Sequence, residues 1–282
     1  MKKIVVAGAG AMGTNIAQAF AQSGLTVVLY NRRQPSLDRA TGQITKSLEK
    51  LVSKGRMTAE EKDAIWGRLT FSTDMNLAAD ADLVLEAIAE NIEVKHTFFA
   101  AVGEICKPET IFATNTSSLS ITEIAAGTDR PDKVIGMHFF NPATVMKLIE
   151  LIRGIQTSDA TFDVVKELSS AIGKEPVEVA EAPGFVVNRI LVPMINEAIC
   201  LAEANVATPE DIDTAMRLGA NHPMGPLTLG DFIGLDICLS IMKIIFAETG
   251  DPKYRPAGLL VKMVRGGKLG RKSGEGFFKY DK

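Results

Sequence analysis

Short apolar runs recur along the first part of the chain and alternate with stretches of helical periodicity. The runs are rich in β-branched residues and nearly continuous, which is typical of strands buried on both faces of a sheet. This alternation predicts an α/β fold with a doubly wound, mostly parallel sheet. The predicted strands are KIVVAG, TVVLYN, ADLVLEAI, TIFATN, KVIGMHFF, KLIELIRG and PVEVAEA.

The pattern changes near residue 183. Pro183 and Gly184 interrupt it, and the apolar positions beyond them follow helical spacing, as in NRILVPMINEAICLAEAN. No further strand pattern occurs until the last residues of the chain. We therefore predict two domains, an α/β domain of residues 1–183 and an all-α domain of residues 184–282.

Two segments carry sharper local signals. Residues 36–68 form an insertion in which apolar positions such as Ile44 and Leu48 fall at helical spacing. Further along, Thr208 is followed by a proline and an acid in capping positions, and Gly219 supplies a stop. We expect a helix from Pro209 to Gly219.

Composition excludes several classes of protein. The formal net charge of −3 argues against an electrostatically driven nucleic-acid binder. The cysteines (Cys106, Cys200 and Cys238) are scattered, so neither a disulfide framework nor a metal site is expected. No apolar run reaches the length of about 18 residues that a membrane span needs. The N-terminus faintly resembles a signal peptide, but its apolar run is short and glycines follow it, so we expect a cytoplasmic protein.

The segment GAGAMG carries the first chemical signal. Gly8, Gly10 and Gly13, with Ala11 and Met12 between them, have the GxGxxG spacing. The motif alone is weak, but here it follows a strand, opens a helix and precedes a second strand. The glycines permit a tight turn and close approach of a pyrophosphate, which the helix N-terminus attracts. We therefore expect a Rossmann-like dinucleotide-binding domain.

The second strand ends in Asn31, Arg32 and Arg33, where an NAD-binding domain usually carries an acid for the ribose hydroxyls. That acid would repel the 2′-phosphate of NADP, whereas an arginine attracts it. The three residues therefore favour NADP over NAD. The alternative is that the arginines form a solvated turn and that Asn31 still bonds an unphosphorylated ribose.

A histidine and a glutamate at strand positions suggest acid–base chemistry. His138 ends a strand, whereas His96 sits beside Lys95 in a predicted surface helix and His222 lies in a proline-rich loop. A lone strand histidine is more often structural than catalytic. Glu150 changes this interpretation because it lies in an apolar strand and needs a partner there. A buried glutamate that orients an imidazole fits a general acid–base pair.

Other polar features follow the predicted strands at the same edge of the sheet. Ser117 lies in TNTSSLS, a composition that alone would indicate only a loop. Ligands of open α/β sheets bind beyond the carboxyl ends of the strands, however. The glycine turn, Asn31, Glu90, Ser117 and His138 each lie at such an end.

The helical insertion places Ser47, Lys50 and Lys54 along one face, with Lys46 and Arg56 nearby. A solvated cationic face is the ordinary interpretation of such a pattern. The sharper one is a docking surface for an anionic, phosphate-bearing substrate.

With these residues in place, the chain resembles the 3-hydroxyacyl-CoA dehydrogenase family, and within it the short-chain, single-function bacterial 3-hydroxybutyryl-CoA dehydrogenases. The resemblance covers nearly the whole chain. The blocks that carry it are GAGAMG, NTSSLSITEIA, IGMHFFNPATVMKLIELIRG, VEVAEAPGFVVNRILVPMINEA, DIDTAMRLGANHPMGPLTLGDFIGLD and GRKSGEGFF.

The resemblance implies a role for each matching position. The catalytic histidine of the family falls on His138, its partner on Glu150, and the substrate contacts on Ser117 and Asn188. Coenzyme A contacts fall on Ser47 and Lys54. The usual aspartate after the second strand is absent, because Asn31 stands there. The implied cofactor contacts are the glycine turn, Glu90, Lys95, Asn115, Ser117, Asn141 and Lys272.

The expected activity is the interconversion of acetoacetyl-CoA and (S)-3-hydroxybutyryl-CoA with NADP(H) or NAD(H). The resemblance also implies a homodimer formed through the C-terminal helices. One alternative is a dehydrogenase of a free 3-hydroxy acid, although such enzymes rely on a lysine in place of the His–Glu pair. Another is a non-catalytic nucleotide-binding descendant, which would be expected to have lost a member of the catalytic set. The four residues of that set, Ser117, His138, Glu150 and Asn188, are all present here.

Overall fold

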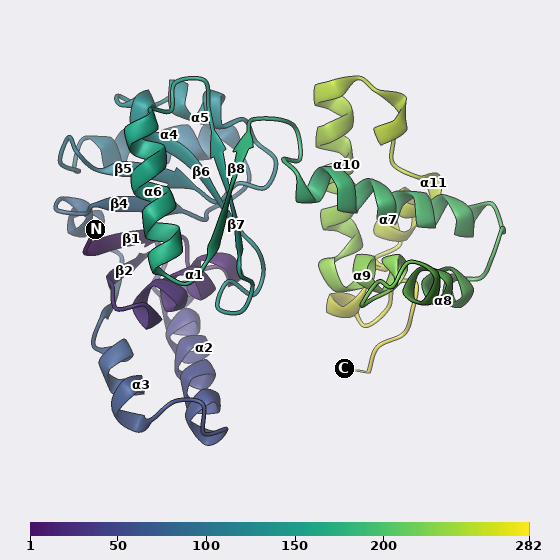
Figure 1. The fold of residues 1–282 in the computed structure, drawn as a ribbon, viewed down its shortest axis with the longest axis horizontal. Helices are drawn as coiled ribbons and strands as arrows, with labels where there is room; N and C mark the ends of the chain where they lie inside the picture. The colour runs from purple at the N-terminus through teal and green to yellow at the C-terminus, as the bar shows by residue number, and fades with distance from the viewer. Residues whose placement is uncertain (282) are drawn as a thin grey trace. The chain divides into compact units, whose positions relative to one another are not determined.

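The computed structural model describes residues 1–281, so Lys282, the last residue of the predicted second domain, lies outside the described residues. The chain forms two compact units, one of Met1–Glu181 and one that begins at Ala182. The first unit is α/β and the second is helical (Figure 1). The predicted fold class is confirmed.

The first unit is built on one eight-stranded sheet with the order β3-β2-β1-β4-β5-β6-β7-β8. All neighbouring strands pair in parallel except β6 and β7, which are antiparallel. The strands are β1 (Lys3–Ala7), β2 (Thr26–Tyr30), β3 (Leu69–Ser72), β4 (Leu83–Glu86), β5 (Ile111–Thr114), β6 (Val134–Phe139), β7 (Leu148–Arg153) and β8 (Glu175–Ala180).

Strand β3 is the one strand of this sheet that the apolar pattern did not predict. Its sequence, LTFS, is short, and no residue in it is fully buried. It pairs only with β2 at one end of the sheet, so it lacks the two-sided burial that marks the other strands.

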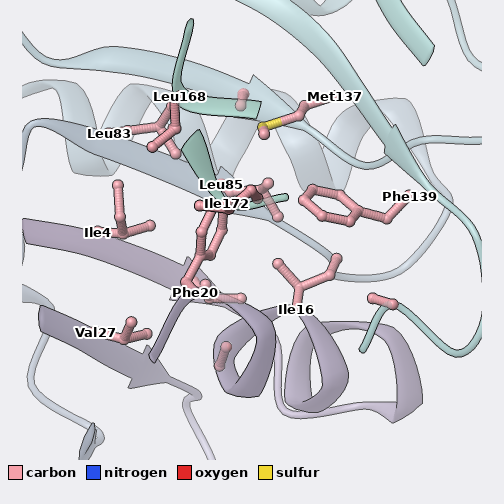
Figure 2. Packing of buried hydrophobic residues seen from close by; sticks show 14 of the residues in the cluster. Ile4, Ile16, Phe20, Val27, Leu83, Leu85, Met137, Phe139, Leu168 and Ile172 are labelled. Carbon is pink, nitrogen blue, oxygen red and sulfur yellow. The ribbon is translucent and has the colours of Figure 1, made fainter. Parts of the chain in front are cut away.

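Helices cover both faces of the sheet. Ile4, Leu83 and Leu85 of the strands pack against Ile16 and Phe20 of helix α1 (Figure 2). On the other face the ring of Phe99 stacks on that of Phe112 at 5.3 Å. Figure 1 shows α6 in front of the sheet and α4 and α5 behind it. The helices of this unit are α1 (Ala11–Gln22), α2 (Gln34–Ser53), α3 (Ala59–Trp66), α4 (Ile92–Gly103), α5 (Ile121–Ala126) and α6 (Asp159–Ala171).

The insertion is the helix pair α2 and α3. Helix α2 places Leu37, Ile44 and Leu48 in the core that α1 shares, so the insertion is anchored at its apolar face. Helix α3 begins with a capping box in which Thr58 and Glu61 satisfy each other's backbone N–H groups. Lys46 and Lys50, the cationic side chains of α2 singled out in the sequence, are exposed and are not part of this core.

In residues 182–281, the second unit contains five α-helices around an apolar core. Thr208 accepts a hydrogen bond from the N–H of Asp211, and the helix runs from Pro209 to Gly219, as predicted. Pro193 lies inside α7, which is longer than the other helices of this unit. The helices are α7 (Val187–Glu203), α8 (Pro209–Gly219), α9 (Pro226–Ile233), α10 (Leu235–Thr249) and α11 (Gly258–Arg265).

Two buried aspartates tie this helical unit together. The Asp213 carboxylate accepts from the N–H groups of Leu227 and Thr228 at 2.8 and 2.9 Å and so caps α9. Asp231 accepts from the N–H groups of Phe277 and Phe278 at 3.0 and 2.9 Å, which fastens the last described segment onto α9.

Among residues 1–281, no helix combines the length and the apolar character that crossing a bilayer requires.

Candidate active site

The carboxyl ends of five parallel strands meet at one edge of the sheet. Ala7 of β1 lies opposite Tyr30 of β2 and Glu86 of β4. Glu86 in turn lies opposite Thr114 of β5, and Thr114 lies opposite Gly136 of β6. The polar segments singled out in the sequence follow these positions, so the fold gathers them along this edge.

The glycine turn joins β1 to α1. Gly8 has a φ of 111° and donates its N–H to the Tyr30 carbonyl at 2.8 Å. A Cβ at Gly13 would lie 1.8 Å from the Gly8 carbonyl oxygen, so only glycine lets the helix approach the strand. A Cβ at Gly10 would meet nothing within 4 Å. The open space at Gly10, the N-cap of α1, therefore fits the pyrophosphate of a dinucleotide.

The end of β2 holds the residues expected to select the cofactor. The side-chain oxygen of Asn31 accepts from the N–H of Arg33 at 3.0 Å, which is a local turn contact. The side chains of Arg32 and Arg33 are both exposed. Asn31 therefore has a structural role in the turn, and Arg32 and Arg33 are exposed residues directly before α2.

Glu90 holds the turn that follows β5. One of its carboxylate oxygens accepts from the hydroxyl of Thr116 at 2.6 Å, from the N–H of Ser117 at 2.9 Å and from the hydroxyl of Ser118 at 3.1 Å. The other oxygen lies 3.3 Å from the ammonium of Lys95. Two predicted cofactor contacts, Glu90 and Lys95, are thus joined to the Ser117 turn.

Lys95 is buried although the helix that carries it lies at the surface, as expected. Glu93, Val94 and Thr97 of α4 are exposed, whereas the Lys95 side chain is 1% exposed. Its ammonium bonds both carboxylate oxygens of Glu86 at 2.6 and 2.8 Å. Helical periodicity alone cannot show this burial, because the partner lies nine residues earlier in a strand.

Glu86 and Thr114 are polar residues at this edge that the sequence analysis missed. The Thr114 hydroxyl donates to Glu86, and the whole Glu86 side chain is buried. The sequence does indicate that Glu86 is buried, because it ends the apolar run LVLE. The same signal, an acid within a buried strand, singled out Glu150.

His138 and Glu150 lie opposite each other across the antiparallel pair β6 and β7. The distance from His138 Nδ1 to Glu150 Oε2 is 2.8 Å, and the two side chains are 5% and 1% exposed. Because a carboxylate only accepts hydrogen bonds, Nδ1 carries the proton in this contact. The ring of Phe140 packs on the imidazole at 4.6 Å between centroids.

Asn115 joins the end of β5 to β6, the strand that carries His138. Its side-chain oxygen accepts from the N–H of Phe139 at 2.9 Å, which ties the end of β5 to β6 next to His138. Asn141 is exposed just beyond β6. Glu90, Lys95, Asn115, Ser117 and the His138–Glu150 pair therefore form one polar region.

The remaining predicted contacts belong to α2 and to the helical unit. Ser47, on α2, accepts from the Gln18 side chain of α1 at 3.0 Å, and Lys54 is exposed at the end of α2. Asn188 lies in the first turn of α7, in the helical unit. Lys272, also in that unit, is exposed and its ammonium contacts Asp236 at 2.6 Å. Within residues 1–281 no group of three or more potential metal ligands occurs.

Family models match nearly all of the chain. Residues 3–182 match the model described as 3-hydroxyacyl-CoA dehydrogenase, NAD binding domain. Residues 184–280 match the model described as 3-hydroxyacyl-CoA dehydrogenase, C-terminal domain.

Individual relatives are similar over their full length. A probable 3-hydroxybutyryl-CoA dehydrogenase of Deinococcus radiodurans is 54% identical, over 99% of this chain and 100% of the relative. A 3-hydroxybutyryl-CoA dehydrogenase of Clostridioides difficile is 53% identical with the same coverage. The crystal structure of (S)-3-hydroxybutyryl-CoA dehydrogenase from Ralstonia eutropha has a TM-score of 0.97 and 46% identity and covers 100% of both chains.

Proposed function

The chain belongs to the 3-hydroxyacyl-CoA dehydrogenase family, and we propose that it interconverts acetoacetyl-CoA and (S)-3-hydroxybutyryl-CoA with a nicotinamide cofactor. The observation that carries this proposal is the buried His138–Glu150 pair at the edge of the sheet where parallel strands end. The names of the similar proteins support the choice of substrate.

His138 is the general acid in the reductive direction. The bound cofactor supplies the hydride that C3 of the substrate receives. His138 gives its Nε2 proton to the oxygen at C3, so that the ketone becomes an alcohol with atoms and charges balanced. In oxidation, the same nitrogen removes the hydroxyl proton. Glu150 keeps the ring in the required tautomer and offsets the positive charge of the imidazolium.

Ser117 and Asn188 bond the oxygen at C3 and hold it in reach of the imidazole in this proposal. Ser47 and Lys54 bind the coenzyme A part of the substrate on the cationic face of α2. The exposure of Lys54 supports that assignment.

NADP is the cofactor we favour. The glycine turn accommodates the pyrophosphate that NADP and NAD share. Asn31 removes the usual carboxylate, and the exposed guanidinium groups of Arg32 and Arg33 can bond a 2′-phosphate. If the enzyme prefers NAD instead, the Asn31 turn is a purely structural feature.

We also propose that the first domain, residues 1–183, binds the cofactor and that the second, from residue 184, forms a homodimer interface. Strongly exposed apolar side chains in the helical unit support this, namely Ile190 at 67%, Val206 at 67% and Leu218 at 78%. Light scattering measures the mass directly. A monomer at working concentration would contradict the dimer and leave the reaction unaffected.

The test of the function is the initial rate of acetoacetyl-CoA reduction, with NADPH and NADH compared in parallel. We expect reduction of acetoacetyl-CoA and a higher kcat/KM with NADPH. Free acetoacetate serves as the matched substrate without coenzyme A. Reduction of acetoacetate at the same efficiency would replace the proposal with a dehydrogenase of free 3-hydroxy acids. A lack of turnover with either substrate would overturn it.

A further inference from the structure

A buried ion pair lies behind the Ser117 turn and takes no part in the proton transfer described above. Its members are Glu86, which is fully buried, and Lys95, which is 1% exposed. We propose that Glu86 is a positioning residue of the cofactor site, which holds Lys95 so that Glu90 and the Ser117 turn keep one geometry. The inference deepens the proposed function and rests on its assignment of Glu90 and the Ser117 turn to the cofactor site.

Contacts inside the protein surround the Glu86 carboxylate. One oxygen accepts from Lys95 at 2.6 Å and from the Thr114 hydroxyl. The other accepts from Lys95 at 2.8 Å and from the N–H of Ile88 at 3.1 Å. A fully buried carboxylate with these donors is not placed to contact a ligand. Any effect of Glu86 on binding is therefore transmitted through its partners.

Lys95 transmits the position of Glu86 to Glu90. Its ammonium, which extends from α4, bonds Glu86 and lies 3.3 Å from the second oxygen of Glu90. The Glu90 side chain is 36% exposed, so it is the member of the group that reaches solvent. The three side chains therefore form a continuous path from the interior of β4 to the surface of the site.

Glu90 completes the path to the turn. Its first oxygen holds the Thr116 hydroxyl and the Ser117 N–H, while its second faces Lys95. Glu90 can keep its first oxygen on the turn only if Lys95 does not draw its carboxylate away. The bonds from Lys95 to Glu86 hold the ammonium in place. Without the charge on Glu86, the buried ammonium has Glu90 as its remaining carboxylate partner and is drawn towards it. Glu90 then shifts, and the Ser117 turn loses its anchor.

The experiment substitutes Glu86→Gln, which preserves size and removes the charge. Misplacement of a binding group by about 1 Å can cost on the order of 100-fold in rate. We expect the Kd of NADPH and of NADH, measured by dihydronicotinamide fluorescence without acyl-CoA, to rise about 10-fold or more. We expect kcat to fall by a similar factor, because the displaced turn carries Ser117, which is also assigned to the substrate oxygen at C3.

Asp82→Asn is the matched control. Asp82 directly precedes β4, the strand that Glu86 ends, and its carboxylate pairs with Lys107 at 2.7 Å. Both substitutions remove an acid paired with a lysine, at opposite ends of the same strand. We expect Asp82→Asn to lower the melting temperature and to leave cofactor Kd and kcat unchanged. Equal kinetic effects in the two variants would show that Glu86 is merely structural.

Thr114 offers a milder pair of variants. Thr114→Val removes one donor from Glu86, and Thr114→Ser restores the hydroxyl. We expect the valine variant to raise cofactor Kd and the serine variant to return it to the wild-type value. If Glu86→Gln does not fold, an unchanged Kd in Thr114→Val overturns the proposal. An unchanged Kd in a folded Glu86→Gln variant overturns it as well.

The fluorescence titration separates the two proposals. Wild-type protein that binds the cofactor without reducing acetoacetyl-CoA would contradict the proposed function. The role of Glu86 would then still be decided by the Kd values of its variants.

Discussion

Polar side chains within apolar strands of the α/β unit are buried and paired. His138 and Glu150 satisfy each other across two strands, and Glu86 is satisfied by Lys95 from a helix. Because an unpaired buried charge is costly, the position of each of these acids in an apolar strand already implies a partner. The sequence predicts the partner of Glu150, a second polar residue at a strand end. It does not predict the partner of Glu86, since Lys95 occupies a helix position that looks exposed.

His138 is the residue proposed to transfer the proton, and its substitution tests that role. We expect His138→Gln to lower kcat by about 100- to 10,000-fold, because glutamine cannot exchange a proton at the C3 oxygen. Cofactor Kd should stay at its wild-type value, since the imidazole is assigned no contact with the dinucleotide. Steady-state rates and fluorescence titration measure the two quantities. Wild-type turnover would refute the assignment of His138.

The second prediction concerns cofactor choice at the end of β2. We expect Asn31→Asp combined with Arg32→Ile to lower the kcat/KM ratio of NADPH to NADH by about 10-fold or more, since the new carboxylate repels a 2′-phosphate. Arg265→Ile, which removes an exposed arginine from the helical unit, is the control. A ratio that stays constant in the double variant would make Arg32 an ordinary surface residue.

Gly10 and Gly13 of the glycine turn between β1 and α1 have different structural roles. Gly13 lets α1 lie against the turn after β1, where a Cβ would be 1.8 Å from the Gly8 carbonyl, whereas space is open around Gly10. The sequence predicts the strand–turn–helix unit correctly because local spacing encodes it. It does not predict β3, which pairs with β2 although the whole helical insertion separates the two strands in the sequence.

This difference gives the third prediction. We expect Gly13→Ala to destabilise the protein by several kcal/mol, because the new Cβ would overlap the Gly8 carbonyl and the helix must move. Gly10→Ala should fold with a melting temperature close to that of the wild type and should raise cofactor Kd. Thermal unfolding and fluorescence titration distinguish the two effects. Loss of folding in Gly10→Ala would mean that this glycine is structural and is not kept for a ligand.

The fourth prediction concerns the beginning of β4. Burial opposes ionisation of Asp82, but Lys107 and the N–H groups of Lys2 and Lys3 outweigh it and lower the pKa of the carboxyl to about 2. A carboxyl with a depressed folded-state pKa contributes stability above its unfolded pKa of about 3.9, and this contribution is lost as the pH falls through the folded pKa.

We therefore expect Asp82→Asn to cost about 1 kcal/mol at pH 7, a discounted figure because the carboxylate is partly solvated. The free energy of unfolding in urea, measured from pH 7 down to pH 3, gives the comparison. The gap between wild type and variant should narrow below about pH 4. A gap that widens as the pH falls would contradict the ion pair.

For the whole molecule, the change from strand–helix alternation to helices alone is visible in the sequence, and the family models divide between residues 182 and 184. The structure divides the chain after Glu181. The pattern of apolar residues can reveal this change because each unit has its own apolar core, one around the sheet and one among the helices. Patterns do not reveal contacts such as Asp231 with Phe277, in which an acid in one helix binds the backbone of a segment 46 residues later.

That contact has a consequence for biosynthesis. Asp231 is 1% exposed, and its carboxylate accepts hydrogen bonds from residues 277–280. On the ribosome, the sheet can close once β8 has emerged, whereas the helical unit must wait for almost all of its sequence. The α/β unit is therefore expected to mature first, and apolar faces of α7 to α11 stay open to chaperones for longer. Nascent chains halted at residue 276 should show a protease-resistant N-terminal unit and a sensitive helical one, and resistance of both would contradict this order of events.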